Sequence, residues 1–482
     1  MNRIIIIRHG ESIGNANNII QGRNNDYGLT EKGKEYTLSN IQTNMNLFAG
    51  ATRIITSTSK RTIETAEIIA KQLDLPLMFN SSLEEMDAGV LSGMKKDTAK
   101  TNYPNYYQIW KERKDLDSIP YAETGENLQA RVIGFLIQYY EEPQFCDVIV
   151  SHAGFIRCLI NIIENRERTF QFDIENSSIF LVDNLFEKMD IQKRERAMNS
   201  KVLIINTANG KYVAKLKRGR SAEQDYAERD LLDCLPGDNL PRILSMQKIS
   251  DDRFCKIIKY VKGRHIYGKL KEKEYNALIE SEEKFEKTLK QVKSTKFRTN
   301  NLSEKLKIIY MNAKNEYIKE KARILLDSKY SKIINNVECY VLSHNDFNRD
   351  NILFEEIEKG KTRANIIDFE SLEFAPPDFQ FASMLASGML LEGEDMQKIK
   401  QTIQRRGKDV GTILYLMQIR TLEGLYFFAE KENEYSTTNK KASGELLKKY
   451  FFNSEIIQRE IVSLQTPEIK REGREELWED IL

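Results

Sequence analysis

Short apolar runs alternate with amphipathic stretches along the first part of the chain. Ile4–Ile7 is wholly apolar, as expected of a strand that is covered on both faces of a sheet. Arg53–Thr56 and Asp147–Val150 predict two further short strands. The apolar positions of Arg61–Leu73 fall at helical spacing, and another helical segment follows from Phe155 onward. Strands that alternate with helices predict an α/β fold, with a doubly wound, mostly parallel sheet and helices on both faces.

A different pattern begins after the charged stretch Glu187–Ser200, which has no apolar stripe. We place a domain boundary there, so that the predicted domains are residues 1–190 and 191–482. Two strand-like runs then flank Asn209-Gly210, a strong hairpin signal. The segments that follow are a charged helix, Lys/Glu-rich helices, two short strands and a helical remainder, at residues 221–235, 270–332, 340–342, 365–368 and 379–482.

Composition narrows the possible functions. The 482 residues include 73 Lys+Arg and 72 Asp+Glu, which gives a formal net charge of +1. This balance lacks the basic excess of nucleic-acid binders, so no nucleic-acid partner is expected. No apolar run reaches the ~20 residues of a membrane helix, and Ile4–Ile7 is too short for a signal-peptide core. We therefore expect a cytoplasmic protein without a membrane partner. Five cysteines without a C-x-x-C pair predict reduced thiols and no zinc site.

Two of the four histidines directly follow predicted strands. His9 lies in Arg8-His9-Gly10-Glu11-Ser12 after the first strand, and His152 lies in Ser151-His152-Ala153-Gly154 after the third. Ligands of open parallel sheets bind beyond the carboxyl ends of the strands, so both histidines are expected at one edge. Arg61 lies at the start of the helix after the second strand, where the helix N-terminus favours an anion.

This combination suits phosphoryl transfer through histidine. A neutral ring nitrogen of His9 can attack phosphorus, provided that its other nitrogen donates a hydrogen bond, which we expect to reach a backbone carbonyl. Arg8 and Arg61 can hold the phosphoryl oxygens with forked donors, and we expect a protonated His152 to add another donor. A carboxylic acid must also protonate the leaving oxygen. The stretch Leu83–Gly89 supplies three candidates for that acid, namely Glu84, Glu85 and Asp87.

Residues 1–186 resemble the histidine phosphatase, or phosphoglycerate-mutase-like, superfamily. The motifs that carry the resemblance occur in order: R-H-G-E-S, Asn15, Gln21-Gly22, Leu29-Thr30 with Gly33, Ser57 and Arg61 of S-x-x-x-R, Thr65-Ala66, Glu85 before Gly89, Gly125-Glu126 and Ser151–Gly154. The resemblance implies His9 as nucleophile, Glu85 as acid and later base, and no cofactor. It implies a phosphate pocket made by Arg8, Arg61, His152 and Asn15.

Several alternatives stay open in this first domain. Glu84 and Asp87 compete with Glu85 for the role of the acid. Hydrolase and mutase activity are not separated by these residues, and hydrolysis is the simpler expectation. An aromatic cluster is interpreted as packing of a connecting segment, with a lid over the substrate as the alternative; its members are Tyr103, Tyr106, Tyr107 and Trp110.

Polar residues also follow two strands of the second domain. Phosphoryl transfer from ATP needs a carboxylate that deprotonates the acceptor hydroxyl, oxygen ligands for Mg²⁺ and a cation on the phosphates. Asp346, in Ser343–Asn351, can be the base. Asn351 and Asp368 can both reach Mg²⁺.

The predicted hairpin and the helix after it supply the remaining groups for ATP. Lys215 can contact the phosphates, and Lys217 on the same strand face is the alternative. Glu228 can hold that lysine in an ion pair, with Glu223 as the alternative.

Residues from about 200 to 482 resemble aminoglycoside phosphotransferases and choline or ethanolamine kinases, through H-N-D-x-x-x-x-N-I-L, I-I-D-F-E and Pro377-Asp378. The resemblance implies a bilobal, kinase-like α+β domain with a largely helical C-lobe, ATP and Mg²⁺ as cofactors, and a small hydroxyl-bearing acceptor. Asn348 agrees with a small acceptor, because protein serine/threonine kinases usually carry lysine there. No glycine-rich phosphate loop precedes Val202.

The leading hypothesis is a bifunctional enzyme that removes phosphate from one small molecule and adds phosphate from ATP to a hydroxyl of another. Choline, an amino-alcohol and a sugar are all compatible acceptors. The missing glycine loop motivates an alternative, in which a catalytically silent nucleotide-binding module regulates the phosphatase. A phosphoglycerate-mutase-type mutase fused to a kinase is the other alternative.

Overall fold

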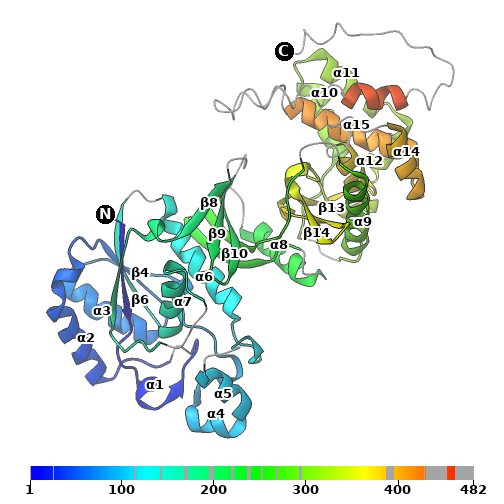
Figure 1. The fold of residues 1–482 in the computed structure, drawn as a ribbon. Coiled ribbons are helices and arrows are strands. Elements are labelled where there is room, and N and C mark those ends of the chain that lie inside the picture. The colour runs from blue at the N-terminus through cyan, green and yellow to red at the C-terminus, as the bar shows by residue number, and fades with distance from the viewer. Residues whose placement is uncertain are drawn as a thin grey trace. The chain divides into compact units, whose positions relative to one another are not determined.

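The computed structural model describes residues 2–24, 26–112, 116–141, 144–167, 172–194, 200–218, 222–235, 240–250, 253–266, 270–292, 296–386, 396–427, 429 and 453–461. Packing divides the chain into two compact units (Figure 1). The first is Met1–Ala222 with Arg242–Tyr260, and the second is Glu223–Pro241 with Val261–Leu482. Each unit is described by itself.

A five-stranded sheet in the order β4-β3-β6-β1-β7 is the frame of the first unit. Its strands are β1 (Asn2–Arg8), β3 (Arg53–Thr56), β4 (Leu77–Phe79), β6 (Phe145–Ser151) and β7 (Ile179–Asp183). All pairings are parallel except that of β7 with β1, which is antiparallel. The predicted α/β class and the mostly parallel sheet are thus confirmed.

Alternate residues of β1 enter two separate cores. Ile4 and Ile6 pack in a core with α6 (Gly125–Ile137) and α7 (Ala153–Ile163). Ile5 and Ile7 pack in a second core with residues of α2 (Glu31–Thr43) and α3 (Lys60–Leu73). Because successive side chains of a strand point to opposite faces, two helices cover each face of the sheet, as the wholly apolar run predicted (Figure 1).

A small layer of short elements lies beside the catalytic loops. It consists of α1 (Ile13–Ala16), β2 (Ile19–Ile20), β5 (Met94–Lys95), α4 (Lys96–Asn102) and α5 (Pro104–Glu112), and β2 pairs with β5. The aromatic cluster of α4 and α5 packs against a buried group that includes Ile20, Leu91 and Ala99. The predicted packing role of the aromatic side chains is confirmed.

A second, antiparallel sheet belongs to the first unit, in the order β11-β12-β10-β9-β8. Its strands are β8 (Asp190–Arg194), β9 (Ser200–Thr207), β10 (Gly210–Arg218), β11 (Ile243–Ser250) and β12 (Arg253–Lys259). The predicted hairpin is present, because β9 and β10 pair around Asn209-Gly210.

The second sheet packs against α6. The Tyr212 hydroxyl donates to Gln129 Oε1 at 2.6 Å, and Gln247 Nε2 donates to the carbonyl oxygen of Arg131 at 2.6 Å. Leu203 and Ile257 of this sheet share one core with the helix. The predicted division into residues 1–190 and 191–482 stays a prediction, whereas packing groups β8–β12 with the first unit.

Helices dominate the second unit. They are α8 (Ala222–Cys234), α9 (Glu272–Leu289), α10 (Leu302–Asn312), α11 (Glu316–Leu326), α12 (Lys332–Asn335), α13 (Phe379–Met384), α14 (Met396–Arg405) and α15 (Val410–Tyr426). Two antiparallel pairs of strands accompany them: β13 (Val341–His344) with β16 (Leu372–Ala375), and β14 (Ile352–Glu358) with β15 (Lys361–Ile366). Most of the predicted helical remainder after residue 427 lies outside the described residues. Within the described part, no helix combines the length and the apolar character needed to cross a membrane.

Candidate active site

The two predicted histidines meet at the carboxyl edge of the first sheet. Arg8 and Ser151 are register partners at the ends of β1 and β6, so the residues that follow them emerge side by side. The ring centroids of His9 and His152 lie 5.2 Å apart, with their planes inclined by 62°. Both side chains are buried.

The tautomer of His9 is set by the loop that carries it. Its Nδ1 lies 2.8 Å from the carbonyl oxygen of Gly10, which can only accept, so Nδ1 carries the proton and Nε2 keeps a lone pair. The predicted carbonyl contact is therefore confirmed. Burial, reinforced by Arg61 and Arg8, lowers the pKa of His9 well below its usual value, which keeps the ring neutral.

His152 is also neutral, and the prediction that it is protonated is wrong for the free protein. Arg61 Nε donates to His152 Nδ1 at 3.2 Å, so this nitrogen accepts and carries no proton. Nε2 then donates to Ser57 Oγ at 3.0 Å. Burial and the charge of Arg61 lower the pKa of His152. The neutral ring still offers its Nε2 proton as a donor.

Arg61 is a nearly fully buried cation. Its two terminal nitrogens donate to the carbonyl oxygens of Asn24, at 2.7 Å, and Gly22, at 3.0 Å. Burial lowers its pKa to about 10, so the guanidinium stays charged at neutral pH. Arg8 donates to the carbonyl oxygen of Ile174 and lines the same cavity. Two positive charges therefore lie beside the His9 ring.

Asn15 closes the loop after His9. Its Oδ1 accepts from the Ser12 backbone, at 3.2 Å, and from the Ser12 hydroxyl, at 2.9 Å, which caps α1. Asn15 also lines the cavity. The structure thus brings together every side chain that was predicted for the phosphate pocket.

The three candidate acids have different surroundings. Glu85 accepts from its neighbour's backbone N at 2.9 Å and from the Gly154 backbone N at 3.2 Å, and it lines the cavity. A Cβ at residue 154 would lie 2.4 Å from Glu85 Oε1, so only glycine admits this approach. Asp87 lines the cavity but uses Oδ1 within its own turn, whereas Glu84 accepts from Thr58 Oγ1 at 2.5 Å and is not part of the lining. The geometry favours Glu85.

Arg8, His9, Asn15, Arg61, Glu85 and Asp87 line a cavity of about 580 Å³, which leaves room for a leaving group beyond the phosphate. Trp110 lines it and thereby adds a contact surface to its packing role. Further charged side chains of the lining are Lys96, Arg157, Asp173 and Glu175.

Three predicted residues of the second site come together within the second unit. Asp346 accepts from Asn351 Nδ2 at 3.0 Å and, through its other oxygen, from Arg420 at 3.3 Å. The backbone N of Ile367 donates to the carbonyl oxygen of Asn351 at 2.9 Å, which brings Asp368 beside it. Asp368 has a left-handed backbone with φ of 64° and lies two residues after the end of β15.

The residues predicted to contact ATP belong to different units. Lys215, like its alternative Lys217, lies on β10 of the first unit, and Glu228, like Glu223, lies on α8 of the second. The ion pair of Lys215 with Glu228 stays a prediction. Within the second unit the structure adds an acidic group, because carboxylate oxygens of Asp225, Glu228 and Glu370 lie within 4.8 Å of one another.

Comparison with known proteins gives two matches. Residues 4–193 match the histidine phosphatase superfamily (branch 1), and residues 192–404 match the phosphotransferase enzyme family. Proteins of Salmonella paratyphi C and Citrobacter koseri, both named "Probable phosphoglycerate mutase GpmB", are 33% identical over 164 residues, which is 34% of this chain and 75% of the relative. The chain belongs to the histidine phosphatase superfamily.

Two solved structures are among those to which this histidine phosphatase is similar. A mycobacterial glucosyl-3-phosphoglycerate phosphatase in complex with VO3 is 18% identical, with 43% of this chain and 99% of that chain covered and a TM-score of 0.34. A phosphoserine phosphatase from Entamoeba histolytica, in complex with 3-phosphoglyceric acid, is 22% identical, with 38% and 90% covered and a TM-score of 0.32.

Sequence reasoning missed some residues of this histidine phosphatase. Asn176 Nδ2 donates to the carbonyl oxygens of His9, at 3.0 Å, and Gly10, at 3.1 Å. It lies three residues before the edge strand β7, which was not predicted. Because β7 runs antiparallel to β1, the start of β7 lies beside the end of β1. Arg23, Glu123 and Arg131 were missed too. The two arginines donate to backbone carbonyls that no motif marks, and Glu123 pairs with both arginines.

Proposed function

We propose that this histidine phosphatase hydrolyses small phosphomonoesters through a phosphorylated His9. The observation that carries the proposal is the neutral His9 ring, whose Nδ1 is engaged by a carbonyl and whose Nε2 keeps a lone pair beside two arginines. Arg8 and Arg61 stabilise the negative charge of the phosphoryl oxygens, and the Nε2 proton of His152 becomes a further donor when it turns from Ser57 Oγ to the phosphoryl group. Hydrogen bonds from fixed donors are worth most where charge accumulates during the transfer.

The reaction then proceeds in two steps. His9 Nε2 forms a bond to phosphorus as the bond from phosphorus to the ester oxygen breaks, and Glu85 gives its proton to that oxygen. In the second step Glu85 takes a proton from water, whose oxygen attacks the phosphohistidine and releases inorganic phosphate. Asp87 is the alternative acid, because it also lines the cavity. A mutase would instead return the phosphoryl group to a second hydroxyl of the substrate.

We propose that the region of the phosphotransferase family phosphorylates a small-molecule hydroxyl, with Asp346 as the base. Its oxygen donors fit Mg²⁺: Asn351 uses its amide nitrogen toward Asp346, which turns its carbonyl oxygen away, and Asp368 offers a carboxylate. ATP with Mg²⁺ would supply the phosphoryl group. Asp346 accepts the hydroxyl proton, and Asn351 and Asp368 hold the cation.

A paired-variant screen tests both proposals. Wild type, His9→Ala and Asp346→Ala are incubated with phosphorylated and hydroxylated metabolites, with and without ATP and Mg²⁺, and phosphate release and ADP formation are scored separately. We expect His9→Ala to lose phosphate release alone and Asp346→Ala to lose ADP formation alone, so each variant is the folding control for the other. Both assignments fail if neither variant changes the activities found.

The same screen addresses the regulatory alternative. Nucleotide binding by the wild type without ADP formation would favour a silent module. Transfer of labelled phosphate to a second hydroxyl, rather than to water, would favour the mutase.

A further inference from the structure

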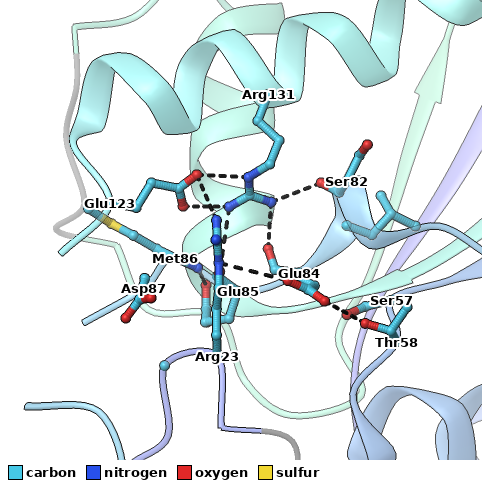
Figure 2. Close-up of polar contacts among 12 residues, drawn as sticks. Arg23, Ser57, Thr58, Ser82, Glu84, Glu85, Met86, Asp87, Glu123 and Arg131 are labelled. Carbon is cyan, nitrogen blue, oxygen red and sulfur yellow. Dashed lines mark hydrogen bonds and ion pairs between the residues drawn. The ribbon is translucent and has the colours of Figure 1, made fainter. Parts of the chain in front are cut away.

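Three charged side chains, those of Arg23, Glu123 and Arg131, lie beside the loop that carries Glu85 (Figure 2). We refer to them as the carbonyl clamp. Arg131, on α6, donates through one terminal nitrogen to the carbonyl oxygens of Ser82, at 2.8 Å, and Glu84, at 2.7 Å. Its other terminal nitrogen lies 3.5 Å from the carbonyl oxygen of Glu85. Arg131 therefore contacts the main chain on both sides of the proposed acid.

Glu123 joins the two arginines of the clamp. Its carboxylate accepts two hydrogen bonds from Arg131, at 2.8 and 2.6 Å, and lies 2.9 Å from an Arg23 nitrogen. Arg23 Nε donates to the carbonyl oxygen of Glu85 at 3.2 Å. The Arg131 and Glu123 side chains are only 11% and 8% exposed, so this forked pair is shielded from water.

The backbone of Glu123 completes the attachment, because its N–H donates to the carbonyl oxygen of Asp87 at 3.1 Å. The clamp residues thus donate to four backbone carbonyl oxygens of residues 82–87, and none of these hydrogen bonds involves the Glu85 side chain. That side chain is left to accept from the Gly154 backbone and to line the cavity.

The clamp does not bind substrate directly, since none of its three residues belongs to the lining of the 580 Å³ cavity. Backbone carbonyls outside helices and sheets need donors, and here the guanidinium groups of Arg131 and Arg23 supply them. The position of the acid loop therefore depends on the forked geometry of Arg131, which lysine cannot reproduce.

We propose that Arg131, held by Glu123 and Arg23, is a positioning residue that places Glu85 for proton transfer to the leaving group. The inference rests on the proposed function, in which Glu85 is the acid. A displacement of about 1 Å can cost a transfer reaction ~100-fold. Clamp variants should therefore lose more activity on a substrate whose leaving group needs a proton, because the clamp acts only through Glu85.

The test compares two probes that differ in that need. The oxygen of p-nitrophenyl phosphate leaves readily without a proton, whereas that of glycerol 3-phosphate requires one. The measured quantity is kcat/KM, which reports the steps up to release of the alcohol. We expect Arg131→Lys to lower kcat/KM by about 10- to 100-fold for glycerol 3-phosphate and by less than about 3-fold for p-nitrophenyl phosphate.

A double-variant cycle separates positioning from general damage. Glu85→Gln alone should show the same selectivity for the leaving group, and adding Arg131→Lys to it should cost little more, because the acid that the clamp positions is already absent. Arg53→Lys is the matched control: Arg53 also holds a buried carboxylate, that of Asp147, at 2.8 Å, but far along the strand from the catalytic loops. It should leave both probes unchanged. Glu123→Gln is the second variant if Arg131→Lys does not fold.

The possible failures are distinguishable. The inference is overturned if Arg131→Lys and Glu123→Gln lower kcat/KM equally for both probes, or if their losses multiply with that of Glu85→Gln. The assignment of Glu85 as the acid fails instead if Glu85→Gln spares glycerol 3-phosphate hydrolysis. The proposed function itself fails if His9→Ala leaves hydrolysis of both probes intact.

Discussion

The two active-site histidines show how burial decides the chemistry of a single side chain. His9 and His152 are both buried, and nearby Arg61 adds to the effect of burial, so both pKa values are lowered well below the usual range. A histidine that stays neutral keeps its lone pair for nucleophilic attack. In the unfolded chain the same rings would titrate near pH ~6.5.

This difference predicts a loss of stability in mild acid. Below pH ~6.5 these histidines become protonated in the unfolded chain, whereas the buried rings of the folded chain stay neutral. Each histidine therefore lowers the free energy of unfolding by up to about 1.4 kcal/mol for each pH unit below this value. Above it, the histidines have no such effect. We expect the thermal midpoint of the wild type to fall between pH 7.5 and 5.5, and that of His152→Gln to fall less steeply. Calorimetry across this range measures both, and parallel curves would contradict the expectation.

At the scale of single residues, the sequence predicted which side chains form the site better than it predicted their protonation states. The carbonyl contact of His9 followed from the need to fix a tautomer and is present. The protonation of His152 was predicted wrongly, because the approach of Arg61 Nε to its Nδ1 depends on side-chain packing that no motif encodes. The same is true of Asn176, which holds the His9 loop from a distant segment.

At the scale of elements, the first turn of α2 packs directly on the catalytic loop. Thr30 caps this helix through the Gly33 backbone N, at 2.9 Å, and its own N–H donates to the carbonyl oxygen of Glu11 at 2.9 Å. A Cβ on Gly33 would lie 2.2 Å from that same carbonyl oxygen. Because backbone cannot yield as a flexible side chain does, only glycine fits there.

Gly33→Ala should therefore push α2 away from the His9 loop. We expect a destabilisation of about 1–3 kcal/mol, typical of overpacking, and a fall in phosphatase kcat. Chemical unfolding and steady-state kinetics measure the two effects. Glu35→Ala, at an exposed position of the same helix, is the control and should change neither. A Gly33→Ala variant as stable and active as this control would refute the close packing.

The spacing of apolar residues predicted the helices and strands whose own sequence decides how they are buried. Ile4–Ile7 and Arg61–Leu73 became β1 and α3 because an apolar run and a helical stripe each have one way to be buried. The edge strand β7 escaped prediction, since Ile179–Asp183 carries no motif and its pairing with β1 is set 170 or more residues away. The local sequence of a strand does not show which other strand it pairs with.

At the scale of the whole molecule, the region that matches the histidine phosphatase family ends before the unit in which it packs. The histidine phosphatase match ends at residue 193, within β8, yet β9–β12 pack with α6 in the same unit. Val132, Ile133 and Phe135 of α6 are fully buried. Removing β9–β12 would expose apolar surface, at a cost of about 25 cal/mol per Å².

A fragment that ends at Arg194 tests this reading. It keeps every residue that matches the family, but it lacks the strands that cover α6. We expect it to be insoluble or to unfold at a lower temperature than the full chain, as measured by solubility and by circular dichroism on heating. A fragment with the thermal midpoint and phosphatase activity of the full chain would show that the second sheet is dispensable.

Motifs predicted where both candidate sites lie, whereas they did not predict how the second sheet packs. The ends of β1, β6 and β15 could be located because catalytic residues follow strands. The contact between Tyr212 and Gln129 joins segments 83 residues apart and depends on the shapes of two surfaces.

The most direct test of the central claim is to trap the phosphoryl group on His9. Glu85→Gln is mixed with p-nitrophenyl phosphate, whose leaving oxygen needs no acid, so that the first step proceeds and the base of the second is missing. After a quench in alkali, where phosphohistidine survives, mass spectrometry of peptides locates the modification. We predict one PO₃ group on His9 that acid removes and that is absent from His9→Ala. Release of p-nitrophenol with no such group, or with the group on another residue, would contradict the account.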